Sequence, residues 1–124
     1  MNLVYIAAGG SAGAIARYLV SEAVNLNFRQ SLPFATLLVN STGSFFIGFL
    51  FILFEKFKVP NELKLLCITG FLGAYTTFST YSLDTMRLLL AGRVLGAFLN
   101  FALSNGVCLL FVFAGIQAAR LVAR

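Results

Sequence analysis

The sequence contains no histidine and no tryptophan, and it carries unusually little charge. Of its 124 residues, 10% are charged and 60% are hydrophobic, whereas a soluble domain has about 25% charged residues. Without histidine there is no imidazole for acid–base chemistry, for a Ser-His-Asp or Cys-His arrangement, or for a His-ligated metal site. The composition therefore argues against an enzyme, and the mean hydropathy of +0.93 predicts a single domain embedded in lipid.

Cysteine is also scarce, and the basic residues are dispersed. Cys67 and Cys108 stand 41 residues apart in apolar runs, without the CxxC spacing of a metal or redox site. We interpret both as small apolar packing residues. The formal net charge is +5, but the basic residues are scattered along the chain. This distribution favours positions at membrane interfaces over a nucleic-acid surface.

Charged residues divide the chain into four apolar stretches. Each can cross a hydrocarbon core about 30 Å thick, which takes about 20 helical residues, and none alternates in polarity like a barrel strand. The first contains Gly9, Gly10 and Gly13, a spacing typical of close helix–helix contacts. We predict an all-α membrane protein, one domain over residues 1–124, with four transmembrane helices at approximately 2–24, 31–55, 62–91 and 94–120.

The charge distribution leaves the orientation in the membrane undecided. An even number of spans places both termini on one side, and that side has five basic residues against three on the other. These are Lys56, Lys58, Lys64, Arg120 and Arg124 against Arg29, Arg87 and Arg93. The positive-inside rule works on larger differences. Two interpretations stay open: a weakly encoded cytoplasmic N-terminus, or a chain that inserts both ways and pairs with an inverted copy of itself.

The third stretch has too many hydroxyls for an ordinary membrane helix. In Gly70–Asp84 (GFLGAYTTFSTYSLD), five of the seven residues from Thr76 to Ser82 are serine or threonine. A hydroxyl can bond the carbonyl one turn back, but that explains one or two such residues more readily than five. We predict a break in this helix, whose freed carbonyls suit a hard cation such as Na⁺. The alternative is a packing face of small residues.

Two aromatic residues are interleaved with these hydroxyls. Phe78 and Tyr81 are three apart and share a face if the helix resumes after the break. The edge of an aromatic ring is positive, so rings turned edge-on to a passage attract an anion weakly. The alternative use of both rings is contact with lipid or filling of the core.

Polar residues also interrupt the other apolar stretches. Asn40 lies midway along the second, and Asn100 and Ser104 are four apart on one face of the fourth, with Asn105 on a neighbouring face. Amides and hydroxyls donate to an anion without carrying charge, or they hold helices together at about 0.6 kcal/mol each. Arg17, inside the first span, either snorkels to the interface, pairs with the nearby glutamate at position 22, or lines a vestibule that gathers anions.

The segment GFLGAYTTFSTYS resembles the third-helix signature of the Fluc (CrcB) family of fluoride channels. Three other segments are similar to that family's in the same order: GGSAGAIARY (9–18), ATLLVNSTGSFFIG (35–48) and LNFALSN (99–105). The resemblance covers essentially the whole chain. It implies a dual-topology antiparallel homodimer with two fluoride pores, passive fluoride efflux and fluoride resistance. It also implies a structural Na⁺ at the dimer interface and a place in the inner membrane of a prokaryote.

The resemblance also implies roles for individual residues. The backbone carbonyls of Gly73 and Thr76 would hold the Na⁺, and Arg17 would lie at an aqueous vestibule. Phe78 and Tyr81 would turn their ring edges to fluoride, although Tyr81 stands where the family commonly has a second phenylalanine. The other pore-lining residues would be Asn40, Ser79, Thr80, Asn100 and Ser104. Further departures from the family pattern are Ala35 and Ala74 in place of glycines, and Asp84 in place of a glutamate.

Two functions from other classes compete with a channel. A proton-coupled antiporter of the small multidrug type is also four-helical and dimeric, but it needs a carboxylate near the bilayer midplane. The acid closest to that requirement is Glu22, near the end of the first span. A non-transporting scaffold would use the polar residues only as helix contacts. A flux measurement separates these functions.

Overall fold

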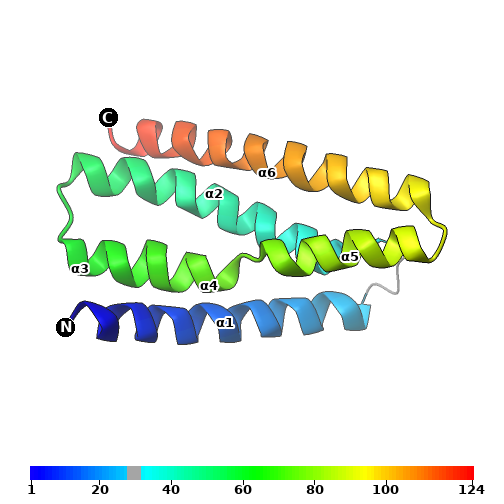
Figure 1. Cartoon of the computed structure of the whole chain (residues 1–124). Helices are drawn as coiled ribbons and strands as arrows, with labels where there is room; N and C mark the ends of the chain where they lie inside the picture. The colour runs from blue at the N-terminus through cyan, green and yellow to red at the C-terminus, as the bar shows by residue number, and fades with distance from the viewer. Residues whose placement is uncertain (28–31) are drawn as a thin grey trace.

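The computed structural model describes residues 1–27 and 32–124 as a bundle of antiparallel helices, with both termini at the same end (Figure 1). Within these residues the chain forms helices and no strands. In order they are α1 (Asn2–Asn27), α2 (Phe34–Lys56), α3 (Asn61–Lys64), the π-helix η1 (Leu65–Leu72), α4 (Gly73–Tyr75), α5 (Phe78–Leu90) and α6 (Val94–Val122). Arg29 and residue 31, the predicted start of the second span, lie outside the described residues.

Three of the helices are long and apolar enough to cross a membrane: α1, α2 and α6. By length and composition the chain is therefore a multi-pass membrane protein with an all-helical fold. The third predicted span is not one continuous helix, because α3, η1, α4 and α5 follow one another along it (Figure 1). The observed ends also differ from the predicted ones: α1 continues three residues past 24, and α6 two residues past 120.

Glycines allow the helix backbones to approach each other closely at two contacts. A Cβ atom at Gly13 of α1 would overlap the carbonyl of Phe71 in η1, and one at Gly115 of α6 would overlap the carbonyl of Phe45 in α2. Gly9 meets the backbone of η1 in the same way. The close contact predicted for the glycines of the first span is thus confirmed at Gly9 and Gly13. The contacts of Gly9 and Gly13 hold η1 against α1, and the contact of Gly115 holds α6 against α2.

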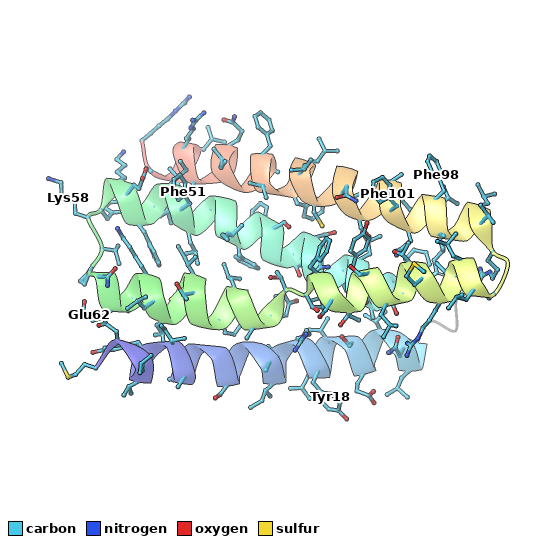
Figure 2. All side chains as sticks on the ribbon, in the orientation of Figure 1. Tyr18, Phe51, Lys58, Glu62, Phe98 and Phe101 are labelled. Atoms are coloured by element: carbon cyan, nitrogen blue, oxygen red, sulfur yellow. The ribbon has the colours of Figure 1, made fainter. Side chains whose placement is uncertain are left out.

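A single chain buries little of its apolar surface. Only 11% to 22% of the residues in the three spanning windows are buried. Large side chains such as Tyr18 and Phe98 project outward from the bundle (Figure 2), and Phe51 is also exposed. An exposed apolar surface of this extent needs lipid or another protein surface to cover it.

Charged side chains stand in the turns at the ends of the bundle. Lys58 and Glu62 lie in and beside the turn between α2 and α3, at the end that carries both termini (Figure 2). Arg93 lies in the turn between α5 and α6, at the opposite end (Figure 1). These turns therefore suit the two membrane–water interfaces, whereas Arg17 lies within α1.

Candidate functional site

The helical path is interrupted at Thr76 and Thr77. Both residues have extended backbone, with φ −81° and ψ 154° at Thr76 and φ −150° and ψ 117° at Thr77. They separate the end of α4 at Tyr75 from the start of α5 at Phe78. Thr77 is the N-cap of α5, since its Oγ1 accepts a hydrogen bond from the Thr80 N–H at 3.3 Å. Threonine suits this place because it favours extended backbone and can cap a helix.

The side chain of Asn40 in α2 binds the extended backbone at Thr77. Its Oδ1 accepts from the Thr77 N–H at 2.8 Å, and its Nδ2 donates to the Thr77 carbonyl at 3.0 Å. One amide thus satisfies two backbone groups at membrane depth, where an unsatisfied group costs several kcal/mol. One Nδ2 hydrogen of Asn40 remains for a further acceptor.

The interruption removes the usual helical donors from two backbone carbonyls. In a continuous helix the carbonyl of Gly73 would accept from the N–H of Thr77, and that of Thr76 from the N–H of Thr80. Here the Thr77 N–H donates to Asn40, and the Thr80 N–H donates to the Thr77 hydroxyl. Carbonyl oxygens released in this way are the kind of ligand that a hard cation accepts.

Hydroxyls cluster at the start of α5. The Oγ1 of Thr77 donates to the Oγ1 of Thr80 at 3.1 Å and lies 3.3 Å from the Oγ of Ser79. The structure thus brings together Ser79 and Thr80, which the sequence singled out. Thr77, which the site prediction omitted, is at the centre of the cluster.

Phe78 and Tyr81 lie on one face of α5, as their spacing predicted. Their ring centroids are 5.3 Å apart and their planes are inclined by 54°. Their surroundings differ sharply, because Phe78 is 76% exposed on the chain whereas Tyr81 is 8% exposed. The hydroxyl of Tyr81 contacts α6, where it accepts from Nδ2 of Asn105 at 3.1 Å.

The polar face of α6 packs against α5. The Nδ2 of Asn100 donates to the Thr85 hydroxyl at 2.9 Å, and its Oδ1 accepts from the Ser104 hydroxyl at 3.5 Å. Asn100 and Ser104 are both buried, which confirms that they share a face. The interhelical contact, one of the two uses that the sequence left open for Asn100, is present.

A cavity of about 390 Å³ lies beside the interruption, between α2, η1, α4, α5 and α6. None of the residues that line it is charged. Its walls are mostly apolar, with amide and hydroxyl groups at a few points. It brings together six of the ten predicted site residues: Asn40, Gly73, Thr76, Phe78, Tyr81 and Ser104. Ser79 and Asn100 line neither this cavity nor the one described next.

A second cavity, of about 250 Å³, lies between α1, α2 and the start of α5. Arg17 lines it together with Thr36, Thr77 and Thr80. Thr77 lines both cavities, so this one residue connects the cavity of Arg17 with the larger one. Pairing of Arg17 with the glutamate at position 22 is not observed, because in residues 1–27 and 32–124 the one ion pair is Asp84–Arg87, at 3.9 Å.

Besides the bonds of Asn40 to Thr77, two contacts of the site were missed by reasoning from the sequence. The hydroxyl of Thr36 in α2 donates to Oδ2 of Asp84 in α5 at 2.8 Å, whereas the sequence marks Asp84 only as a departure from the family pattern. Asn105 is not among the predicted site residues, yet it contacts Tyr81. The spacing of these residues in the sequence does not predict either contact, because Thr36 and Asp84 are 48 residues apart and Tyr81 and Asn105 are 24 residues apart. Only the polarity of each residue within an apolar run marks it as a candidate.

The chain is similar to known proteins over nearly its whole length. The model of the family described as CrcB-like protein, Camphor Resistance (CrcB), matches residues 4–116. The chain is 47% identical over 116 residues to a fluoride-specific ion channel FluC of Shewanella loihica, covering 94% of both proteins. It is 43% identical over 123 residues to one of Magnetococcus marinus, covering 98% of this chain and 100% of that one. It is 45% identical over 116 residues to a fluoride-specific ion channel FluC of Shewanella woodyi, covering 94% of both proteins.

Proposed function

The chain belongs to the CrcB-like family, and from this premise we propose that it is a fluoride-selective ion channel. It lets fluoride leave the cytoplasm passively across the plasma membrane of a prokaryote and thereby gives fluoride resistance. The observation that carries the proposal is the cavity beside the interruption, which offers an anion neutral donors and aromatic rings and has no charged residue in its lining. The names of the curated relatives support the same function. A channel changes no covalent bond, so no enzymatic activity is proposed.

A neutral lining suits an anion that must leave as readily as it enters. Fluoride is small and strongly hydrated, so it enters only where donors replace its water. Two unit charges 4 Å apart attract each other by about 4 kcal/mol at an effective dielectric constant of 20. A fixed cation in the cavity would therefore retain the ion. The remaining N–H of Asn40 offers weaker attraction, and Ser104 adds a polar wall at a separate point.

The smaller cavity supplies the entrance to this pathway. Arg17 attracts anions there, outside the uncharged cavity, and so raises their local concentration without holding them inside it. Thr77 and Thr80, whose hydroxyls bond each other, line this smaller cavity, and Thr77 also lines the larger one. We therefore place the path of fluoride from Arg17 past these hydroxyls, and then to Asn40, the rings of Phe78 and Tyr81, and Ser104.

The functional unit is an antiparallel homodimer with two pores. A side chain as apolar as Phe78, 76% exposed beside the neutral cavity, is best covered by a second copy of the chain. The low burial within one chain supports the same assembly. Since five basic residues on one side against three on the other encode orientation weakly, both orientations occur, and each monomer is a single four-helix transmembrane domain.

The interruption also fits a structural Na⁺ at the dimer interface. The carbonyls of Gly73 and Thr76 would hold it, because both have lost their helical donors and carbonyl oxygens are ligands for hard cations. Cys, Asp and Glu side chains form no group of three or more in the described part of the chain, and the proposed ligands are therefore backbone oxygens. Bound there, the ion would offset the negative ends of the carbonyl dipoles at the centre of the dimer.

The two rival functions receive less support from the same observations. A proton-coupled antiporter needs a carboxylate that loads and unloads protons near the midplane. Glu22 lies near the end of α1, and the Asp84 carboxylate is bound by Thr36. A scaffold would need no cavity of about 390 Å³ at the interruption. Both rivals predict no passive fluoride flux.

Fluoride efflux from liposomes tests the proposal. The purified protein is reconstituted in vesicles loaded with potassium fluoride, valinomycin is added to balance charge, and a fluoride electrode records release. We expect rapid loss of fluoride, and no comparable loss of chloride from vesicles loaded with potassium chloride. Folded dimer that releases no fluoride would overturn the proposed function.

A further inference from the structure

Asn105 of α6 contacts the hydroxyl of Tyr81, and the surroundings of its amide determine which of the two groups donates the hydrogen bond. Its Nδ2 lies 2.7 Å from the carbonyl oxygen of Phe101 and 3.1 Å from Oη of Tyr81. A carbonyl oxygen only accepts, so the amide atom beside Phe101 must be the nitrogen. That nitrogen has two hydrogens, and one is available for each neighbour.

The direction of this bond leaves the phenol proton of Tyr81 available. An amide nitrogen only donates, so Oη of Tyr81 accepts from Asn105, and the Tyr81 hydroxyl can donate to another acceptor. Tyr81 and Asn105 both line the cavity of about 390 Å³. An anion bound in that cavity could therefore accept a hydrogen bond from the Tyr81 hydroxyl.

Tyr75 provides the opposite case within the same chain. Its Oη lies 2.9 Å from Oγ1 of Thr42, and the Thr42 hydroxyl itself donates to the carbonyl of Leu38 at 2.8 Å. The Tyr75 hydroxyl is therefore the donor to Thr42, and its proton is already used. Of these two buried tyrosines, only Tyr81 has a proton to offer to an anion.

We infer that Asn105 is a positioning residue, which holds the Tyr81 hydroxyl as an acceptor so that its proton points into the cavity and donates to fluoride. This inference rests on the proposed function and deepens it, because it adds an O–H donor to the ring edge at position 81. Hydrogen bonds to an ion are roughly twice as strong as neutral ones. Losing the donor should therefore reduce fluoride flux measurably, although the ring remains.

A double-mutant comparison of fluoride efflux tests the inference. We expect Tyr81→Phe to lower the flux about tenfold, the effect of losing a hydrogen bond to a charged group. Asn105→Leu, which keeps the branching and the number of side-chain heavy atoms, should lower it about threefold by releasing the hydroxyl from its orientation. In the Tyr81→Phe background, Asn105→Leu should have no further effect. Tyr75→Phe, the matched control, should leave the flux within about twofold of the wild type.

Difference infrared spectroscopy provides a second readout, which should stay unchanged if Asn105 only contributes to packing. The C–O stretching band of Tyr81, assigned by its loss in Tyr81→Phe, should shift when fluoride is added and not when chloride is added. In Asn105→Leu the band should already be displaced before fluoride is added. If the leucine variant yields no dimer, Asn105→Ala replaces it in both measurements.

The possible failures are distinguishable. A wild-type protein without fluoride flux overturns both the channel and this inference. Wild-type flux with equal losses from the Asn105 variant in both backgrounds overturns the positioning role alone. Wild-type flux with a Tyr81 band that does not respond to fluoride overturns the donor role of the hydroxyl.

Discussion

Replacing Asn40 by leucine removes both hydrogen bonds from the extended backbone at Thr77 while keeping a side chain of similar size. The Thr77 N–H and carbonyl, bonded at 2.8 and 3.0 Å in the wild type, would both lack partners. An unsatisfied buried polar group costs about 1–3 kcal/mol, so the expected loss of stability is about 2–6 kcal/mol. If Asn40 were only an interhelical contact, two hydrogen bonds at about 0.6 kcal/mol each would give about 1.2 kcal/mol. The two interpretations therefore predict different magnitudes.

The measurement is equilibrium unfolding in mixed micelles, followed by fluoride efflux from the same preparation. Thr42→Val is the matched control, because it lies two residues along α2. Its hydroxyl accepts from Tyr75 at 2.9 Å and otherwise bonds only carbonyls of its own helix, those of Leu38 and Val39. This substitution should cost about 1 kcal/mol and preserve flux. Asn40→Leu should lose more than about 2 kcal/mol and all measurable flux. A loss no larger than that of the Thr42 variant, with normal flux, would refute the role of Asn40 in satisfying the interruption.

Three further predictions follow from the same structure. Phe78→Ile should abolish fluoride flux while the dimer elutes normally on size exclusion, and normal flux would exclude a role for the ring edge. Gly13→Ala should sharply reduce the yield of folded protein, because a Cβ atom there overlaps the η1 backbone. The control Gly106→Ala, with open space around it, should be tolerated, and equal yields of the two variants would contradict the close contact. In a background without the native cysteines, Lys58→Cys should cross-link across the dimer to Arg93→Cys and not to itself, since these positions lie at opposite ends of the bundle; self-cross-linking of Lys58→Cys alone would indicate a parallel dimer.

The sequence predicted most reliably what depends on neighbouring residues. Hydropathy over about 20 residues found α1, α2 and α6, because crossing a bilayer imposes that length on a helix. The glycines of the first span predicted close packing, and Gly9 and Gly13 meet the backbone of η1. Helical spacing placed Phe78 beside Tyr81, and Asn100 beside Ser104.

Contacts between distant segments could not be predicted in the same way. The bonds of Asn40 to Thr77 join residues 37 positions apart, and the partner of an isolated amide depends on how α2 is rotated against α5. Apolar helices encode such a rotation weakly, because their faces differ little in polarity. The same reason hid the contact between Asn105 and Tyr81. The exact helix ends were also missed, as at Asn27 of α1, since helix ends are read from capping signals that this sequence hardly provides.

Because the site contains so little charge, single substitutions cannot always separate its role in folding from its role in fluoride passage. Because the cavity uses neutral groups, a side chain that lines it can also satisfy the backbone, and Asn40 does both. A variant of Asn40 therefore changes folding and the pathway together, so its loss of flux alone cannot measure attraction for an anion. Phe78 has no hydrogen-bonding group and is 76% exposed on the chain, so its replacement disturbs the monomer fold least. The strength of the neutral pathway is best measured at Phe78, with Asn40 reserved for measuring what keeps the interruption in place.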